Sequence, residues 1–272
     1  MSDKFNAIVA EEIDGSTVAS LRQLTLADLP DEPVLVDVGY STLNYKDGLA
    51  VSGKGRICRT LPLICGIDLA GTVAQSADPA YKAGDRVLVN GYGMSELYNG
   101  GYSQKQRIKP DWIVRVPDGM SLEETMAIGT AGYTAMLCVQ ALQDHGVEPG
   151  SGPVLVTGAA GGVGSVAVAL LARLGYEVHA STGRIEAEGD FLRKLGASAL
   201  LPRGELARDS KPLERETWAG VVDTVGDKVL ATAIAQTRYE GTVTACGLAG
   251  GMNLPTSVAP FILRGVTLRG ID

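Results

Sequence analysis

A glycine-rich turn between two apolar runs constrains the fold of this chain more than any other feature. The stretch VLVTGAAGGVGSVAVALLARLGYEV, residues 154–178, predicts a buried strand, a turn and a helix. Ala159, Gly161 and Gly164 match the dinucleotide-binding pattern, with alanine in the first position. Gly161 allows a pyrophosphate to approach the backbone, and Gly164 allows the helix to pack on the strand. A structural tight turn is the alternative, because a bare glycine pattern is weak.

The residues after Pro149 favour the binding interpretation because strands and helices alternate there. The apolar runs are continuous, which is typical of parallel strands covered on both faces: GPVLVTG, YEVHAS, ALLP, GVVDTVG, GTVTACG and GVTLRGI. Helical stretches lie between them at GSVAVALLARLG, EGDFLRKLG and DKVLATAIAQT. This part therefore predicts a Rossmann domain, a doubly wound parallel sheet.

The first part of the chain has a different pattern. From Phe5 to about Pro117 the apolar runs are short and β-branched, and Gly, Pro, Asp and Asn separate them, which predicts an antiparallel β domain. Ser121 and Glu124 have the spacing of a capping box, and Gly129 and Gly132 are expected to divide the following stretch into two helices. We expect an α/β chain with domains at residues 1–122 and 123–272.

The end of the second predicted strand indicates which cofactor the turn binds. About 20 residues beyond the glycines, an acidic residue pairs with the ribose of NAD in many dinucleotide-binding folds. Ser181, Thr182, Gly183 and Arg184 stand here instead, and two hydroxyls with a guanidinium suit a phosphate dianion. A solvated loop arginine is the alternative. The pattern favours NADPH.

Composition excludes several classes of function. The net charge of −7 and the pI near 5.0 argue against nucleic-acid binding as the main role. The N-terminal residues lack a signal-peptide pattern, and no apolar window approaches the ~20 residues of a membrane span. Four separated cysteines and two histidines give no zinc-cluster spacing. We expect a cytoplasmic protein with reduced thiols and no bound metal.

Several motifs together resemble one family. They include STLNYKDGLAVSGKG, GIDLAGTV, GTAGYTAMLCVQAL, LPRGE, WAGVVDTVGDKVLA, ACGLAGG and PFILRGVTLRGID, besides the glycine turn. The chain is similar over nearly its whole length to the bacterial acryloyl-CoA reductase family, on the zinc-free quinone-oxidoreductase side of the medium-chain dehydrogenase/reductase superfamily. The resemblance implies a GroES-like β domain followed by an NADPH-binding Rossmann domain. It also implies reduction of acryloyl-CoA to propanoyl-CoA.

Two departures from the superfamily pattern affect what the resemblance implies. Zinc-dependent relatives carry Gly-His-Glu where this chain has Gly66, Ile67 and Asp68, which favours a metal-free mechanism. Family members continue beyond LRGID with a segment that returns to the first domain, whereas this sequence ends at Asp272. We therefore expect the completing part of the first domain, and one pyrophosphate contact, to be absent.

The resemblance also implies roles for individual residues. Asn44, Tyr45, Lys46 and Asp47 follow an apolar strand, and we predict that they lie in a loop of the first domain. The resemblance places Asn44 and Tyr45 beside the nicotinamide, where an amide can orient a ligand and a phenol can donate a proton. Tyr45 as a packing residue, and Thr130 as a helix cap, are the alternatives. The residues expected to contact the cofactor are Tyr45, Thr130, Ala160, Gly161, Gly162, Val163, Ser181, Thr182, Gly183, Arg184, Arg203, Cys246, Gly247 and Leu248.

The predicted function is hydride transfer from NADPH to a short enoyl thioester. A quinone or an enone is the alternative substrate within the same enzyme class, and a non-catalytic NADPH-binding protein is the alternative outside it. We expect a small-molecule substrate, a homodimer, and no nucleic-acid or membrane partner.

Overall fold

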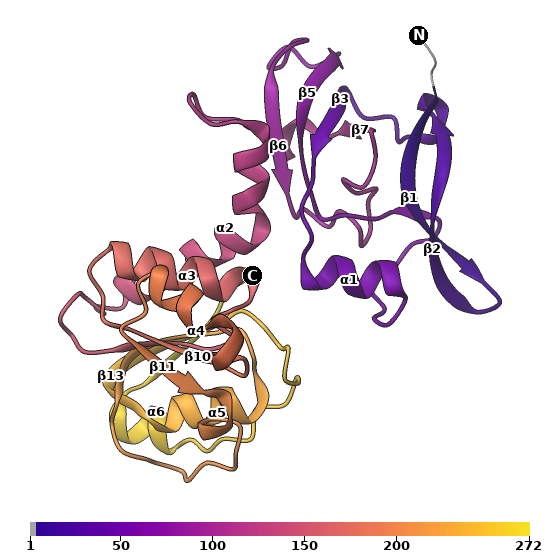
Figure 1. Cartoon of the computed structure of the whole chain (residues 1–272). Coiled ribbons are helices and arrows are strands. Elements are labelled where there is room, and N and C mark those ends of the chain that lie inside the picture. Colours follow the sequence, from indigo (N-terminus) through magenta and orange to yellow (C-terminus); the bar gives the residue numbers. More distant parts are fainter. Residues whose placement is uncertain (1–3) are drawn as a thin grey trace. The chain divides into compact units, whose positions relative to one another are not determined.

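The protein divides into two compact units. The computed structural model describes residues 4–272, and the division lies between Thr130 and Ala131 (Figure 1). The sequence placed the domain boundary between residues 122 and 123, directly after the first residue of a long helix. That helix, α2 (Leu122–Asp144), belongs partly to each unit.

The first unit is built from antiparallel strands, as predicted. One sheet has the order β2-β1-β4, with strands β1 (Lys4–Ile13), β2 (Ser16–Thr25) and β4 (Leu63–Ile64). The other has the order β7-β3-β5-β6-β8, with β3 (Val34–Tyr40), β5 (Asp68–Ser76), β6 (Arg86–Asn90), β7 (Lys105–Ile108) and β8 (Val114–Arg115). Alternate β-branched side chains of β3 and β6 form the core of this sheet, because a pleated strand turns every second residue to the same face. Short 3₁₀ helices follow β2 and β7, at Leu26–Asp28 and Pro110–Trp112.

The segment after β3 corrects one expectation. We predicted that Asn44, Tyr45, Lys46 and Asp47 lie in a loop, but helix α1 (Tyr45–Ser52) begins there. Asn44 is its N-cap residue, and the Asp47 carboxylate accepts a hydrogen bond of 2.8 Å from the Asn44 backbone amide. This reciprocal cap stabilises the start of α1. The helix is short and contains a glycine, so its sequence shows little of the apolar periodicity by which helices are predicted.

Helix α2 is broken once. Gly129 has φ 51° and ψ −164°, outside helical geometry, so the predicted division into two helices is confirmed at Gly129, and Gly132 lies within the second helical part. The predicted capping box is confirmed: the Ser121 amide donates to Glu124 at 2.7 Å, and the Glu124 amide donates to Ser121 Oγ at 3.1 Å. By length and composition this helix could span a membrane, but half of its most apolar window is buried, and core helices pass the same test.

The second unit contains the predicted parallel sheet. Its order is β11-β10-β9-β12-β13-β14, and its strands are β9 (Val154–Val156), β10 (Val178–Thr182), β11 (Ala199–Pro202), β12 (Trp218–Asp223), β13 (Thr237–Ala245) and β14 (Thr267–Gly270). The helices are α3 (Gly162–Arg173), α4 (Ile185–Lys194), α5 (Asp227–Ala235) and α6 (Ala259–Arg264). The α/β fold predicted from the sequence is confirmed.

Strand β9 shows why the apolar runs are continuous. Val154 and Val156 pack into one core with α3, while Leu155 between them packs into a second core with α5. All three side chains are fully buried. A strand covered on both faces must be apolar at every position, and that requirement made these strands recognisable in the sequence.

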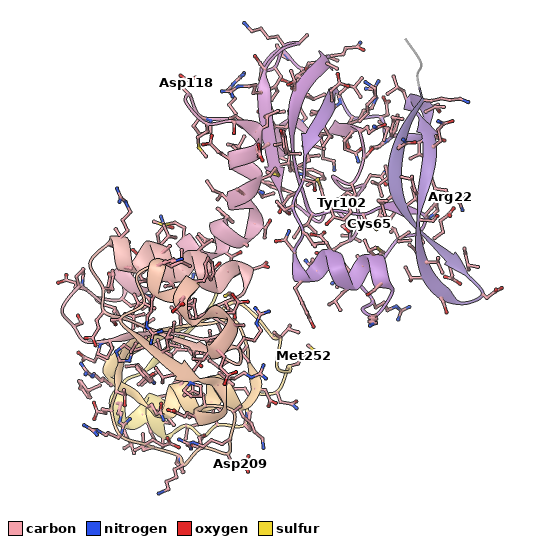
Figure 2. All side chains as sticks on the ribbon, viewed as in Figure 1. Arg22, Cys65, Tyr102, Asp118, Asp209 and Met252 are labelled. Carbon is pink, nitrogen blue, oxygen red and sulfur yellow. The ribbon has the colours of Figure 1, made fainter. Side chains whose placement is uncertain are left out.

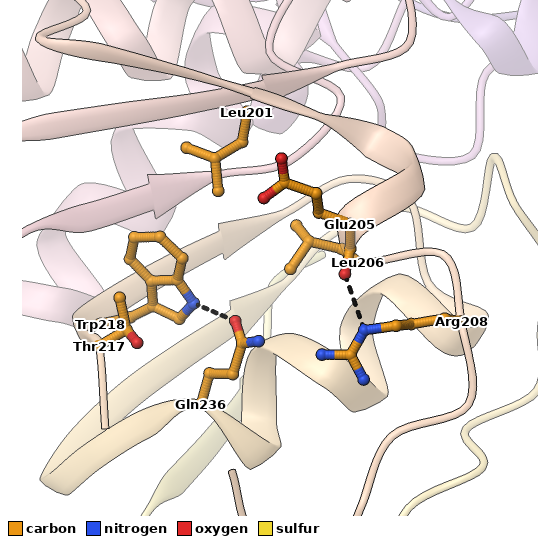
Figure 3. Close-up of a pocket in the computed structure, with 7 residues that line it drawn as sticks. All are labelled: Leu201, Glu205, Leu206, Arg208, Thr217, Trp218 and Gln236. Carbon is orange, nitrogen blue, oxygen red and sulfur yellow. Dashed lines mark hydrogen bonds between the residues drawn. The ribbon is translucent and has the colours of Figure 1, made fainter. Parts of the chain in front are cut away.

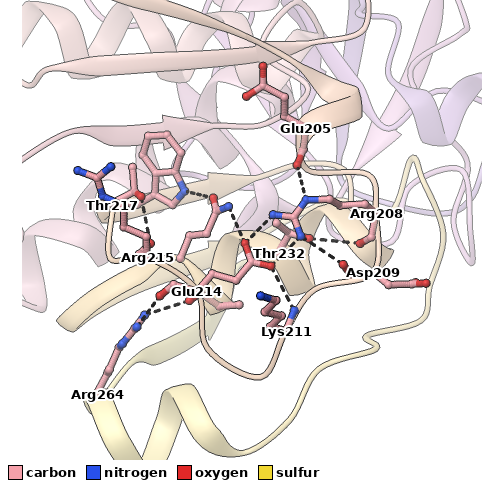
Figure 4. A network of polar contacts seen from close by, with 12 residues as sticks. Glu205, Arg208, Asp209, Lys211, Glu214, Arg215, Thr217, Thr232 and Arg264 are labelled. Carbon is pink, nitrogen blue, oxygen red and sulfur yellow. Dashed lines mark hydrogen bonds and ion pairs between the residues drawn. The ribbon is translucent and has the colours of Figure 1, made fainter.

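The connection from β11 to β12 lacks an α-helix. It contains only a 3₁₀ turn (Arg203–Glu205) and a loop, which leaves a cavity of about 430 Å³ against Leu201, Leu206 and Trp218 (Figure 3). The polar groups around this cavity bond to one another: Trp218 Nε1 donates to Gln236 at 3.0 Å, and Gln236 donates to Glu214 at 2.9 Å. Figure 4 shows the same network, which connects the loop before β12 to the end of α5.

Candidate functional site

A second cavity, of about 460 Å³, opens at the carboxyl ends of β9, β10 and β12. Strand β9 is the point where the strand order reverses, and open α/β sheets bind ligands at such a point. We call this space the cofactor cavity. Its lining residues are Gly158, Ala160, Gly161, Thr182, Gly183, Arg184, Arg203, Thr224, Val225, Ala249 and Gly250.

The cofactor cavity is cationic. Arg184 and Arg203 both line it, and among the residues that the structure describes no Asp or Glu does. Gly183 is in close contact with Arg203, since a Cβ at Gly183 would lie 3.2 Å from the guanidinium carbon. Arg184 Nη2 donates to the carbonyl of Ala160 at 3.3 Å and lies 3.7 Å from Glu188. Two guanidinium groups without a lining carboxylate fit the 2′-phosphate of NADPH.

The glycine turn leaves space for a pyrophosphate. Gly158 has φ 58°, and a Cβ there would lie 2.2 Å from Thr224 Oγ1, so this position requires glycine. The turn closes when the Gly161 amide donates to the Gly158 carbonyl at 2.8 Å, and helix α3 begins at the next residue. The start of α3 therefore presents free backbone amides beside the cavity, which favours a bound anion.

A buried carboxylate, Asp223, holds this edge of the sheet together. It accepts hydrogen bonds from Thr157 Oγ1 at 2.7 Å and from the amides of Val225 and Gly226 at 3.2 and 2.7 Å. Burial raises the pKa of Asp223, and the three donors oppose that shift. Asp223 thus joins the ends of β9 and β12, and we did not single it out from the sequence.

Other residues predicted to contact the cofactor lie outside the cavity lining. Ser181 is only 1% exposed, and its Oγ has no hydrogen-bond partner among the residues that the structure describes. Gly162 and Val163 lie in the first turn of α3. Cys246, Gly247 and Leu248 directly precede the lining residues Ala249 and Gly250.

Cys246 has polar partners for both its backbone amide and its thiol. Its amide and its thiol approach the carbonyl of Asp223, at 2.9 and 3.3 Å. The neighbouring Cys138 thiol is its side-chain partner, and this contact, together with burial, raises the pKa of Cys246. The thiol is therefore kept protonated and unreactive.

In the first unit, Tyr45 and Asn44 have contrasting environments. Tyr45 is the first residue of α1 and is 65% exposed. Its hydroxyl has no hydrogen-bond partner in the described part of the chain. The Asn44 amide, by contrast, donates to Thr42, Asp47 and Asp68.

The buried carboxylate of Asp68 accepts hydrogen bonds from the polar candidate residues of the first unit. Its Oδ2 accepts from Thr42 Oγ1 at 2.5 Å, from Asn44 Nδ2 at 3.0 Å and from the Thr130 amide at 3.1 Å. Its Oδ1 accepts from Asn90 Nδ2 at 2.8 Å and from Thr130 Oγ1 at 2.5 Å. Asp68 is fully buried, and its hydrogen bonds fix the positions of Asn44 and Thr130. Thr130 is the residue directly after the break in α2. From the sequence we considered Asp68 only as the residue that stands where zinc-dependent relatives carry glutamate.

A second buried carboxylate lies next to this group. Asp47 is fully buried, and burial raises its pKa against hydrogen bonds from Asn44 and Ile67. Tyr102, labelled in Figure 2, donates to the carbonyl of Thr42 at 2.7 Å, and burial raises the pKa of its phenol. These groups hold the start of α1 firmly against β5.

The histidines do not take part in either group. His145 Nδ1 bonds to the carbonyl of Ala141, and His179 Nε2 bonds to Glu177. Among the described residues, no three His, Cys, Asp or Glu side chains gather as metal ligands would.

Comparisons with known proteins agree with both units. The model of the alcohol dehydrogenase GroES-like domain matches residues 30–118, and that of the zinc-binding dehydrogenase family matches residues 162–272. The acrylyl-CoA reductase AcuI of Ruegeria pomeroyi is 54% identical over 98% of this chain and 82% of that protein.

Solved structures extend the similarity to the fold. Escherichia coli K-12 YhdH with bound NADPH has a TM-score of 0.95 and 55% identity, over 98% of this chain and 82% of that chain. Bacillus subtilis YhfP with NAD bound has a TM-score of 0.94 and 44% identity, over 100% and 82%. The second protein is also named a putative quinone oxidoreductase.

Proposed function

This chain belongs to the acrylyl-CoA reductase family of the medium-chain dehydrogenase/reductase superfamily, and from that membership we propose that it reduces acryloyl-CoA to propanoyl-CoA with NADPH. It is an NADPH-dependent oxidoreductase. The observation that carries the cofactor assignment is the pair of arginines, Arg184 and Arg203, in a cavity without a lining carboxylate. A carboxylate at this position would repel the 2′-phosphate.

We assign the binding of NADPH to the cofactor cavity. Arg184 and Arg203 hold the 2′-phosphate, and the amides at the start of α3 hold the pyrophosphate. The segment 246–250, which begins beside the carbonyl of Asp223, contributes backbone groups. The bound cofactor supplies a hydride for the β-carbon of the substrate.

We assign the substrate side to Tyr45, Asn44 and Thr130. As hydride reaches the β-carbon, negative charge grows on the thioester oxygen, and a positioned donor stabilises it. Tyr45 supports this role because its exposed hydroxyl is free to donate. Asn44 and Thr130 support a positioning role because Asp68 fixes both side chains before any ligand binds.

Reduction of a quinone or enone is the second candidate function. The name of the B. subtilis relative, at 45% identity over all of this chain, favours it. Such substrates need the same hydride and the same donor at an oxygen, so the residues above would serve either reaction.

Substrate competition separates these candidates. Oxidation of NADPH is followed with acryloyl-CoA, a longer enoyl-CoA, an enone and a quinone at equal concentrations. We expect the highest kcat/KM with acryloyl-CoA. A higher value with the quinone would support the second function, and tight binding of NADPH without oxidation by any substrate would contradict both.

We further propose that the protein forms a homodimer in the cytoplasm. In the described sheet β14 is an edge strand, and α6 beside it exposes Ile262 and Leu263 at 73% and 61%. An unpaired edge with apolar neighbours suits a second copy. All four cysteines are free thiols, which fits a reducing compartment. Sedimentation velocity tests the dimer.

A further inference from the structure

The loop after α1 carries an unusual concentration of positive charge for this protein. Residues 53–60, which we call the α1 loop, read GKGRICRT. They include Lys54, Arg56 and Arg59 and no acidic residue, in a chain whose net charge is −7. All three cationic residues are exposed.

In the described part of the chain, one carboxylate pairs with cations in this region. Glu96 forms an ion pair with Lys46 and lies 3.9 Å from Arg59. Lys54 and Arg56 have no ion pair or side-chain hydrogen bond with any described residue. The α1 loop therefore offers two unpaired cations to a ligand, and the like charges nearby favour an anion of high charge.

The α1 loop is held in place by its backbone. Gly53 has φ 65° and ends α1, and a Cβ there would lie 2.4 Å from the carbonyl oxygen of Thr17 in β2. The Ile57 amide donates to Gly55 at 2.8 Å, and the Arg59 amide donates to Glu96 at 2.8 Å. The backbone that carries these cations is thus held in one conformation, which lowers the conformational entropy lost when a ligand binds.

The position of the α1 loop matches the shape of a CoA thioester. Helix α1 separates Tyr45 from the loop, and its eight residues span about 12 Å. In acryloyl-CoA the pantetheine arm likewise separates the reacting carbons from the diphosphate and the 3′-phosphate. We propose that Lys54 and Arg56 bind these phosphates, a role that rests on the proposed function and on Tyr45 marking the reactive end.

The test compares two thioesters that differ in the phosphates. The double variant Lys54→Ala/Arg56→Ala is assayed with acryloyl-CoA and with acryloyl-pantetheine, which has the same reacting group and no phosphate. We expect the ratio of kcat/KM for acryloyl-CoA to that for acryloyl-pantetheine to fall about tenfold or more, because each lost contact is a charge-assisted hydrogen bond. The loss should appear mainly in KM.

Lys82→Ala is the matched control. Lys82 is also exposed, and it belongs to the connection between β5 and β6. In Figure 1 this connection lies at the end of the first unit opposite α1. This variant should keep the wild-type ratio. An unchanged ratio in the double variant, or an equal fall in the control, would overturn the proposal.

Binding of free coenzyme A separates this inference from the proposed function. Calorimetry with coenzyme A needs no turnover, and we expect the double variant to bind it at least tenfold more weakly than the wild type. If the wild type binds coenzyme A and reduces neither thioester, the proposed reaction fails while the phosphate site stands. Equal coenzyme A affinity in both proteins overturns the site, whatever the turnover.

Discussion

At the scale of single residues, Arg184 and Arg203 should decide which nicotinamide cofactor binds. Arg184→Ala should weaken NADPH binding about tenfold, because a charge-assisted contact to the 2′-phosphate is lost, and should leave NADH binding nearly unchanged. The ion pair with Glu188 contributes little to stability, since Arg184 is 62% exposed in its side chain. Fluorescence titration with both cofactors measures the effect.

The control for this prediction is Arg173→Ala. Arg173 is exposed at the end of α3 and does not line the cofactor cavity, so its removal should affect neither cofactor. Equal weakening of NADPH and NADH in Arg184→Ala would contradict the phosphate assignment.

Tyr45 should act in the transition state. Removing its hydroxyl in Tyr45→Phe keeps the ring, so NADPH affinity should change little, while kcat for acryloyl-CoA should fall about 10²-fold. Steady-state kinetics with a separate NADPH titration distinguishes the two effects. Wild-type turnover in Tyr45→Phe would exclude the hydroxyl of Tyr45 from the reaction and leave its ring with a packing role only.

Asp68 should matter through the residues that it holds. In Asp68→Asn one carboxylate oxygen becomes an amide nitrogen that faces donors from Asn90 and Thr130, or from Asn44 and Thr42. Unfolding free energy should fall by about 1–3 kcal/mol, and kcat should fall more than KM rises. Denaturant titration and kinetics test this, with exposed Asp111→Asn as the control. A stable variant with normal kcat would contradict the positioning role.

At the scale of elements, the contact between α3 and β9 depends on Gly164. A Cβ there would lie 2.4 Å from the Gly158 carbonyl oxygen and 2.8 Å from Ala159 Cα, so the helix must shift. Gly164→Ala should lower the unfolding free energy by about 1–3 kcal/mol, as overpacking does. Gly204→Ala, with no atom within 4 Å of its Cβ, should change it by less than about 0.5 kcal/mol. Urea titration compares them.

The elements also show what the sequence could predict. The strands of the second unit were predictable because burial on both faces makes them apolar throughout. The break in α2 was predictable only to one of two nearby glycines, Gly129 and Gly132. Helix α1 was not predicted, because the contact between Asn44 and Asp47 stabilises its start and its sequence has no helical apolar period. Asp68 was not recognised as a centre, since its donors lie up to 62 residues away in the sequence.

At the scale of the whole molecule, the ion pairs around Glu214 should shape acid stability. Arg208 bonds to both Glu214 oxygens, at 2.7 and 2.5 Å, and lowers the pKa of Glu214 to about 2 (Figure 4). A folded-state pKa below the ordinary value of 4.5 stabilises the protein above that pH and ceases to do so as pH falls towards 2.

Glu214→Gln should therefore be less stable than the wild type at pH 6, and the difference should shrink as pH falls from about 4.5 to 2. Thermal unfolding of both proteins over this range measures it. A difference that stays constant with pH would show that the ionised pair is not its source.

The five hydrogen bonds to Asp68 have a consequence for how this lineage can diverge. Replacement of Asp68 by a residue without a side-chain acceptor removes the partner of part-buried donors on Thr42, Asn90 and Thr130 and one of the partners of Asn44, so intermediates with one change are penalised. Substitutions at this position should therefore be coordinated. In homologues that lack the acid, we expect replacements by apolar or smaller residues at the positions of Thr42, Asn44, Asn90 and Thr130.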